Sequence, residues 1–432
     1  MNISLSKLVK LKLRVKVLYR YFSMNYRFLK VTSYYGSFLE YFYNRYPDIL
    51  SKSFDEHLKL LLSEGFGWGN FFQLNLNKLG NEAHEMVYNA DKLQFAWTRE
   101  NNIKLYSKEE IFLNQLKKIK PEILFLQDVS PFSRDYLNRI RAEVPSIKKI
   151  IGWLCSPFGA EQIKTLASCD FVFSCSELFI SKLKSEGIKC YRLNHAFEKT
   201  LLPQIESDNT YSETDFLFVG SLFPGSELHD LRVEIIEGLL KEKINMKIFS
   251  QFHKIQRIFL KRKAYQFYQL LKRLKLESIY DISSATRRVA DYKEVPRNMT
   301  LSPIFLKALD STPIFGIEML KAYSKAKLGF NYHGGVAGEY ASNIRLFEVT
   351  GAGACLITDH KINISDFFIP DQEVITFKTA DECIEKVKWL LNHPDKRKQI
   401  AQAGHHRTLS EHTFYNRTVE LDSIIKSELS VV

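Results

Sequence analysis

The stretch NIRLFEVTGAGACLITD, residues 343–359, contains the pattern that decides the fold of this chain. Arg345 and Glu348 are three residues apart, so on a helix they share one face. Gly351 and Gly353 follow where that helix ends, and the apolar run after them predicts a short buried strand. Taken alone, the pattern fits a surface ion pair before a glycine cap. The pattern fits a ligand-binding site equally well. In such a site the Arg345 guanidinium binds phosphate, and the Glu348 carboxylate accepts hydrogen bonds from sugar hydroxyls.

The positive charge of the chain is concentrated in two segments. The net charge is +12, from 61 basic and 49 acidic residues. Residues 1–30 and 251–276 each carry eight basic residues and no acid, so the rest holds 45 basic against 49 acidic residues. Apolar residues interleave the cations in both segments, which suits an anionic membrane surface. A solvated face is an equal alternative, and nucleic acid is a weaker one because no nucleic-acid module is recognisable.

Cysteine usage and hydropathy bear on the compartment. The six cysteines form no CxxC pair and no metal-ligand spacing, which indicates a reducing compartment. No apolar run approaches the roughly 18 residues that span a bilayer, and the N-terminus lacks a signal-peptide pattern. We therefore expect a cytoplasmic protein, peripheral on the inner face of a membrane if the basic segments bind lipid.

Alternating strand and helix patterns organise the chain into two domains. At 432 residues it exceeds what one hydrophobic core usually supports. A basic segment over 1–26 precedes a first domain over 27–205, and a polar linker at 204–214 leads to a second domain over 206–432 with a basic insertion at 251–312. Alternation of this kind favours doubly wound parallel sheets. The expected strands are 28–32, 123–126, 149–153, 171–174, 190–193, 216–222 and 328–331.

Several motifs occur in one order along the chain, and together they resemble a known family. Asn331-Tyr332-His333 precedes the opening stretch, and residues 393–397, 401–404 and 411–417 follow it. This order resembles the C-terminal half of GT-B glycosyltransferases, in particular the CgeB-like spore maturation branch. Looser signals at 65–68, 94–97 and 170–176 are similar to the N-terminal half. The resemblance implies an α/β GT-B architecture, in which two Rossmann-like domains with parallel sheets face a central cleft and the final helix crosses back to the first domain.

The resemblance also implies roles for individual residues. A nucleotide sugar, with a UDP-sugar expected, is the donor; no permanently bound cofactor is implied, and metal independence is expected because no Asp-x-Asp triplet is present. Glu348 is the expected ribose ligand and Arg345 the expected phosphate ligand. The other expected donor contacts are Gly220, Ser221, His229, Arg232, His333, Asn343, Gly351 and Gly353. The acceptor candidates are Tyr34, Tyr35 and Ser37, in a loop after the first strand.

The sequence leaves the catalytic base and the stereochemistry open. Asp128, after an apolar strand, and His195, near the domain junction, are the candidate bases for an inverting reaction. The two glutamates of many retaining enzymes are separated by seven residues, whereas Glu339 and Glu348 are separated by eight. The expected acceptor is a glycan or a lipid-linked glycan. A non-catalytic GT-B relative that binds a glycan or a partner protein is the alternative function.

Overall fold

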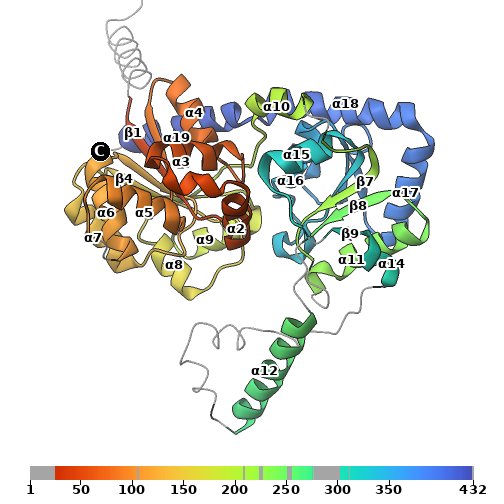
Figure 1. Ribbon diagram of the computed structural model, residues 1–432, viewed down its shortest axis with the longest axis horizontal. Coiled ribbons are helices and arrows are strands. Elements are labelled where there is room, and N and C mark those ends of the chain that lie inside the picture. The colour runs from red at the N-terminus through yellow and green to blue at the C-terminus, as the bar shows by residue number, and fades with distance from the viewer. Residues whose placement is uncertain are drawn as a thin grey trace, which may run out of the picture.

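The chain folds into two lobes joined near the middle of the sequence (Figure 1). The computed structural model describes residues 25–104, 107–207, 210–222, 227–250, 255–274, 276, 302–310 and 312–430, with the backbone alone described for 227–229, 255–262 and 336–337. The basic N-terminal segment up to Met24 lies outside these ranges. Among the described helices, none has the length and apolar character needed to cross a bilayer.

The N-terminal lobe contains a parallel sheet of six described strands in the order β2-β1-β3-β4-β5-β6. The strands are β1 (Arg27–Thr32), β2 (Glu82–Val87), β3 (Ile123–Leu126), β4 (Lys149–Trp153), β5 (Phe171–Ser174) and β6 (Cys190–Arg192). The helices are α2 (Gly36–Arg45), α3 (Phe54–Ser63), α4 (Phe71–Lys78), α5 (Asp91–Glu100), α6 (Lys108–Ile119), α7 (Arg134–Glu143), α8 (Ala160–Leu166) and α9 (Glu177–Ser185). β3 and β5 are buried along their whole length, as strands covered on both faces require.

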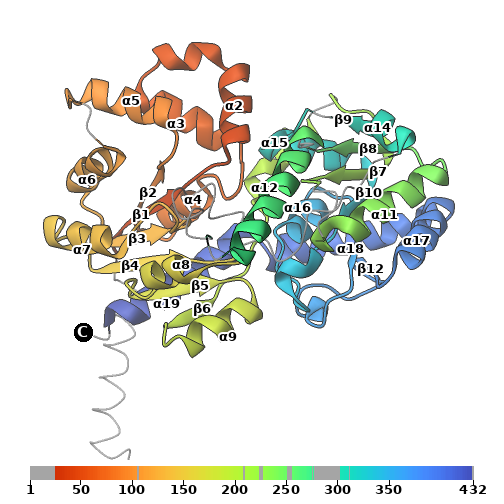
Figure 2. The same cartoon turned by 90° about the horizontal axis from the view of Figure 1, so that it is seen from below.

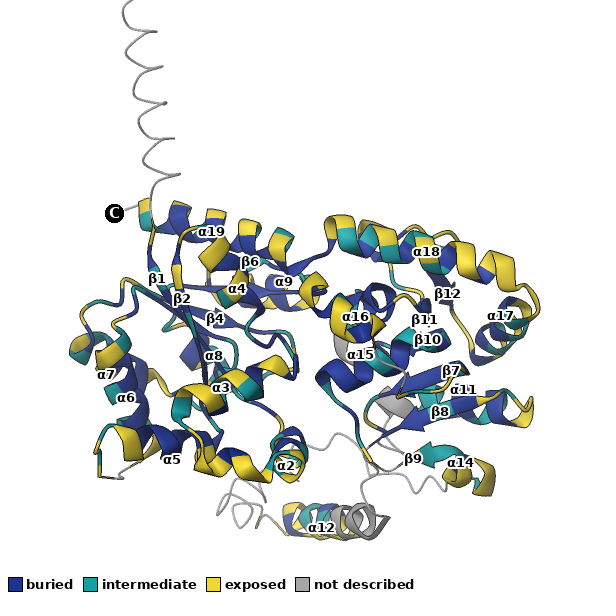
Figure 3. Cartoon of the chain, turned by 45° about the horizontal axis from the view of Figure 1, so that its top comes forward, coloured by how far each residue is buried: buried dark blue, intermediate teal, exposed yellow. Residues whose placement is uncertain are grey.

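The C-terminal lobe repeats this plan, with six described parallel strands in the order β12-β11-β10-β7-β8-β9. The strands are β7 (Thr214–Val219), β8 (Met246–Phe249), β9 (Leu309–Asp310), β10 (Ala326–Asn331), β11 (Cys355–Asp359) and β12 (Ile375–Phe377). The helices are α10 (Leu202–Glu206), α11 (Glu227–Lys241), α12 (Ile255–Arg273), α14 (Pro303–Ala308), α15 (Gly316–Ser324), α16 (Arg345–Gly351), α17 (Ala380–Asn392) and α18 (Pro394–Glu411), and the last helix, α19 (Phe414–Ser430), lies against the N-terminal lobe. The sheets are buried in both lobes, while α17, α18 and α19 expose their outer faces (Figure 3).

The chain crosses between the lobes twice, and the two crossings touch. Phe197 forms a parallel bridge with Thr413, in which Phe197 N donates to His412 O at 2.9 Å and Phe414 N donates to Phe197 O at 2.9 Å. After this bridge α19 runs along the N-terminal lobe and packs on α4. There Asp422 accepts hydrogen bonds from Tyr26 Oη at 2.8 Å and Asn81 Nδ2 at 3.0 Å. These contacts fix the C-terminal helix on the first lobe.

Helix α12 lies within the predicted basic insertion and projects away from the C-terminal lobe (Figures 1 and 2). On its described side chains, Phe267, Leu270 and Leu274 expose 53%, 50% and 59% of their surface. Tyr265 and Leu271 instead form a small buried cluster with Ala264 and Tyr268. The helix is therefore amphipathic, with an apolar stripe open to solvent.

A buried ion pair lies in the sheet of the N-terminal lobe. Lys30 of β1 is the cross-strand neighbour of Glu85 of β2, with Nζ 3.2 Å from Oε2 and both side chains fully buried. Lys30 Nζ also donates to Gly69 O at 3.0 Å and to Gln127 Oε1 at 3.2 Å. Burial lowers the pKa of Lys30 and raises the pKa of Glu85 to about 7. The pair thus ties two strands to the loop that contains Gly69.

Lys30→Met is expected to destabilise the N-terminal lobe by about 3 to 5 kcal/mol, because it leaves Glu85 as a buried acid without a partner. Urea unfolding followed by tryptophan fluorescence measures this, since Trp68, Trp97 and Trp153 all lie in that lobe. The double variant Lys30→Met/Glu85→Leu should recover most of the loss. Equal loss in both variants would contradict the account.

Candidate functional site

The carboxyl ends of both sheets open onto an interlobe cleft with two adjoining cavities. One, of about 330 Å³, is lined mainly by the C-terminal lobe and is called here the donor-side cavity. The other, of about 380 Å³, is lined mainly by the N-terminal lobe and is called the acceptor-side cavity. Tyr35, Asn343 and Ile344 line both cavities, so the two are neighbours. Open α/β sheets bind ligands at this edge.

Arg345 and Glu348 lie together in the wall of the donor-side cavity, on the first turn of α16. Arg345 Nη1 is 2.9 Å from Glu348 Oε2, and the two side chains expose only 19% and 13% of their surface. Burial raises the pKa of Glu348, and Arg345 opposes this shift. The guanidinium also contacts Met319 Sδ and lies 5.5 Å from the ring centroid of Tyr323.

The carboxylate of Glu348 keeps acceptor capacity in this arrangement. Its Oε2 is buried and has no aligned hydrogen-bond donor among the described residues, despite the short distance to Arg345. A buried acceptor without a donor costs free energy, which a ligand hydroxyl can recover. Such an atom on a cavity wall is therefore suited to bind a polar ligand.

The other walls of the donor-side cavity come from the ends of β7 and β8 and from the N-terminal lobe. Gly220 and Ser221 follow β7, and Tyr35 and Ser37 reach the cavity from the loop before α2 and its start. The remaining lining is largely aromatic and aliphatic: Phe66, Gly67, Val219, Phe249, Pro313, Ile314, Phe315, Gly316 and Met319. Apolar walls with few polar groups are typical of small-molecule sites.

His333 and Asp359 form a buried pair at the edge of the C-terminal sheet. His333 follows β10 and lines the acceptor-side cavity, while Asp359 ends β11. Asp359 Oδ1 is 2.7 Å from His333 Nδ1 and accepts from His333 N at 2.9 Å. Burial would raise the pKa of Asp359, but the hydrogen bond and charge of His333 and the charge of Lys361 outweigh it and lower that pKa. The carboxylate is thus ionised and directs His333 Nδ1.

His195 lines the acceptor-side cavity from the N-terminal lobe. Trp68 Nε1 donates to His195 Nδ1 at 3.0 Å. Burial, and to a lesser extent Arg417, lowers the pKa of His195 to about 3. The ring is therefore neutral at physiological pH, and since Nδ1 accepts from the indole, the proton is on Nε2.

Comparisons with known proteins agree with this geometry. Residues 271–423 match the family described as glycosyl transferase-like. Solved structures with similar folds include a glycosyltransferase from Rickettsia africae (11% identity, TM-score 0.54), sucrose-phosphate synthase from Thermosynechococcus elongatus (9%, 0.53) and HepE from Anabaena in complex with UDP-glucose (8%, 0.52). Each alignment covers 94% of this chain and 100% of the other. No curated protein sequence matches the chain.

The chain has the GT-B fold. Its C-terminal half carries a glycosyltransferase-like domain, so the predicted fold and the predicted glycosyltransferase class are both confirmed. The CgeB-like branch stays a prediction.

In this GT-B frame the structure brings most of the predicted donor residues to the cleft. Asn343 lines both cavities, donates from Nδ2 to Asn331 Oδ1 at 2.9 Å and accepts at Oδ1 from Arg345 N at 3.0 Å. Arg232 donates to the carbonyls of Ser221 at 2.7 Å and Tyr332 at 2.9 Å. It therefore braces the loops that follow β7 and β10.

Other predicted residues lie elsewhere. Gly351 packs against Phe197, where a Cβ would meet the ring at 2.3 Å, and Gly353 has φ +92° in the turn before β11; neither lines either cavity. Tyr34 is buried among aromatic rings that include Phe66. The side chain of His229 lies outside the described residues.

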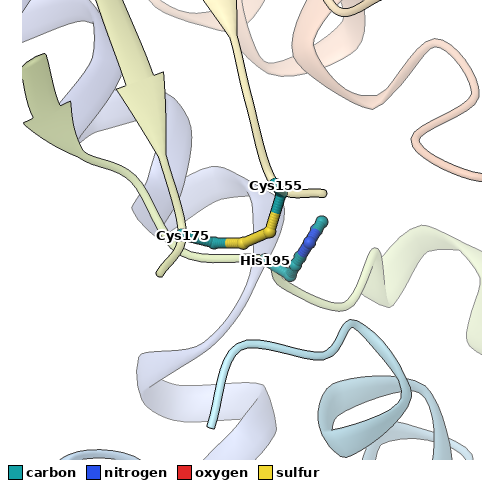
Figure 4. A group of neighbouring side chains, drawn as sticks. All are labelled: Cys155, Cys175 and His195. Carbon is teal, nitrogen blue, oxygen red and sulfur yellow. A yellow bond between two sulfur atoms is a disulfide. The ribbon is translucent and has the colours of Figure 1, made fainter. Parts of the chain in front are cut away.

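Cys155 lines the acceptor-side cavity and belongs to a disulfide that the sequence did not reveal. Cys155 and Cys175, at the ends of β4 and β5, form a disulfide with a Cα–Cα distance of 5.8 Å, and His195 lies beside it (Figure 4). The absence of a CxxC pair did not reveal this disulfide, because adjacent strands bring together two cysteines that are 20 residues apart. The disulfide also weakens the case for a reducing compartment.

Cys155, Cys175 and His195 are also close enough to one another to be considered as metal ligands. One potential ligand atom from each of Cys155, Cys175 and His195 lies within 4.8 Å of the others. The sulfur atoms are bonded to each other, however, and His195 Nδ1 accepts from Trp68 while Nε2 carries the proton. A neutral ring in this tautomer has no free lone pair for a metal. The arrangement therefore fits a disulfide and not a metal centre.

Alkylation of the denatured protein without reductant is expected to modify four cysteines, because Cys169, Cys190, Cys355 and Cys383 are free. After reduction, six should be modified, as counted by intact-mass spectrometry. Cys155→Ser is the matched control and should give five modified cysteines with or without reductant. Six modified cysteines in the unreduced wild type would show that the disulfide is absent.

Proposed function

We propose that this glycosyltransferase moves a sugar from a UDP-sugar to a hydroxyl of a glycan or a lipid-linked glycan, and that it belongs to the CgeB-like branch. The observation that carries the donor assignment is the buried Arg345–Glu348 pair in the wall of the donor-side cavity. Glu348 Oε2 without an aligned donor suits a ribose hydroxyl, and the guanidinium suits the diphosphate. The complex of Anabaena HepE with UDP-glucose supports uridine as the nucleoside of the donor.

The diphosphate charge that builds up during transfer has stabilising groups within this chain. Arg345 supplies a guanidinium, and the backbone after β7 supplies the amide of Ser221, since the Gly220 amide donates to Phe249 O at 3.1 Å. Arg232 holds that backbone through the Ser221 carbonyl. We propose that these groups stabilise the charge of the diphosphate without a resident metal ion.

The acceptor hydroxyl is assigned to the acceptor-side cavity. Tyr35 links the two cavities, and Asp128 and His195 line the acceptor side. Ser37 lies on the donor side, where it can reach the transferred sugar. We therefore propose that the acceptor binds next to the donor sugar, at the boundary between the lobes.

Nucleotide binding tests the donor assignment. UDP at 100 times its Kd should stabilise the wild type by about 2.7 kcal/mol, seen as a rise in Tm against GDP, CMP and dTDP controls. Glu348→Ala is expected to weaken UDP binding roughly 10- to 100-fold in calorimetry, because it removes a charged acceptor worth about 1.5 to 3 kcal/mol. Glu186→Ala, at an exposed site on the N-terminal lobe, is the control.

Two results would contradict the donor assignment. One is that no nucleotide or nucleotide sugar raises the Tm of the wild type. The other is that Glu348→Ala binds UDP as tightly as the wild type does. UDP binding without any release of UDP from UDP-sugars would instead favour the non-catalytic alternative.

The exposed apolar stripe of α12 supports a peripheral membrane location. Phe267, Leu270 and Leu274 form this stripe, and Lys272 and Arg273 are exposed on the last turn. An apolar stripe next to cations suits the interface of an anionic membrane. We propose that α12 and the basic N-terminal segment bring the enzyme to the inner face of a membrane, where a lipid-linked acceptor resides.

Flotation with liposomes tests this location. The wild type should float with vesicles that contain phosphatidylglycerol but not with pure phosphatidylcholine, and high salt should weaken binding. Replacing Phe267, Leu270 and Leu274 by Ser should reduce flotation, as should deletion of residues 1–22.

The matched control replaces three exposed apolar residues on other elements by Ser: Leu178, Ile369 and Val419. This control should float as the wild type does. Equal binding to neutral vesicles, or no binding to either kind, would rule out the electrostatic interaction.

A further inference from the structure

Three side chains that line the acceptor-side cavity carry groups able to accept a proton. They are Asp128 and His195 from the N-terminal lobe and His333 from the C-terminal lobe. Transfer to a hydroxyl requires one group that removes the proton as the new bond forms. The surroundings of each side chain decide which of them has a lone pair that is both available and oriented.

His195 has no available lone pair. Its Nδ1 accepts the indole N–H of Trp68 at 3.0 Å, so Nε2 carries the proton. Burial lowers the pKa of His195 to about 3, which also makes the ring a weak base at neutral pH. His195 is therefore a hydrogen-bond donor in this cavity, suited to bind a hydroxyl oxygen.

The Asp128 carboxylate accepts a hydrogen bond from the backbone of the turn that Asp128 begins. Its Oδ1 accepts from Ser130 N at 2.9 Å, the usual arrangement of an aspartate that begins a turn. Among the described residues, no other side chain holds this carboxylate. Asp128 thus lacks the third group that orients the base in proton-transfer sites.

His333 meets both requirements. Its Nδ1 faces Asp359 Oδ1 at 2.7 Å, and the same carboxylate oxygen accepts from His333 N, which fixes the ring from two directions. Asp359 is held in turn by Lys361 Nζ, 3.3 Å from Oδ2. His333 Nε2 is buried and has no hydrogen-bond partner among the described residues, and 1% of the side chain is exposed. With Nδ1 protonated toward the carboxylate, Nε2 presents a lone pair.

We propose that His333 is the general base of the transfer and that Asp359 is its positioning residue. This proposal rests on the proposed function and adds the proton acceptor to it. Nε2 takes the proton of the acceptor hydroxyl while its oxygen bonds to the anomeric carbon. The bond from that carbon to the diphosphate oxygen breaks, and the nucleoside diphosphate leaves with the electron pair. Asp359 stabilises the imidazolium, which then releases its proton to water.

The charges around His333 set the expected pH dependence. Asp359 and Lys361 face it from the end of β11, and Arg232 approaches from α11 through the carbonyl of Tyr332. The two N-terminal-lobe groups named above face it across the cavity. Asp359 is the charge in direct contact, so its removal should destabilise the imidazolium and move the acid limb of the pH–rate profile to lower pH.

Release of UDP with water as the acceptor tests the base directly. The donor is whichever of UDP-glucose, UDP-galactose and UDP-N-acetylglucosamine stabilises the wild type most. His333→Gln should slow UDP release about 10²- to 10⁴-fold, while UDP binding in calorimetry stays within about twofold. Imidazole added to His333→Gly should restore part of the rate, and His406→Gln, at an exposed site on α18, should behave as the wild type does.

Asp359→Asn tests the positioning role. Its rate should fall roughly 10-fold or more, with the acid limb at lower pH, a shift that a purely structural role would not produce. Proton NMR should show the β anomer as the first sugar released from the α-linked donor, because direct displacement of the diphosphate by a deprotonated water inverts the anomeric centre.

Several outcomes separate the two proposals. If the wild type binds no UDP and releases none, the proposed function itself fails. If it binds UDP but releases none from any UDP-sugar, the non-catalytic alternative is favoured and both proposals fail. If it binds and releases UDP, the base assignment alone is overturned by any of three results: a first product with the α anomer, an unaffected His333→Gln, or a rate that depends on Asp128 and not on His333.

Discussion

The backbone bridge between Phe197 and Thr413 is the constraint on which the rest of the molecule depends. It joins the two chain crossings by hydrogen bonds on both sides of Phe197 and starts α19 on its path along the first lobe. The ring of Phe197 occupies the space where a side chain on Gly351 would begin. Since Gly351 ends α16, the same contact that joins the lobes also holds the helix that carries Arg345 and Glu348.

This constraint explains why the polar groups of the cleft work as a unit. The carboxyl ends of two parallel sheets face each other, so the segments after β7 and β10 line the cleft together with loops from the N-terminal lobe. Charges that would be costly in a core are paired within the C-terminal lobe, as in Arg345 with Glu348 and His333 with Asp359. Each pair leaves one buried atom without a hydrogen-bond partner among the described residues, Glu348 Oε2 and His333 Nε2, and both residues line the cleft. The proposed donor-binding group and the proposed base are therefore already oriented before a ligand binds.

The sequence predicted the features that are local and periodic. Alternating strands and helices indicated two parallel sheets, and the spacing of Arg345 and Glu348 placed both on one helix face. The sequence could not predict features that depend on which strands are neighbours in the sheet. Asp359 meets His333 because β10 and β11 pair in register, and Cys155 meets Cys175 because β4 and β5 do. Likewise, the sequence could not predict that Gly351 lacks a side chain because the ring of Phe197 occupies that space.

The central claim is that the Arg345–Glu348 pair grips the donor nucleotide between the lobes. A crystal structure of the protein with UDP tests it most directly. The account predicts the ribose hydroxyls within hydrogen-bond distance of the Glu348 carboxylate and the diphosphate against Arg345 and the backbone of Gly220 and Ser221. A nucleotide bound outside the interlobe cleft, or one in the cleft whose ribose does not contact Glu348, would contradict the account.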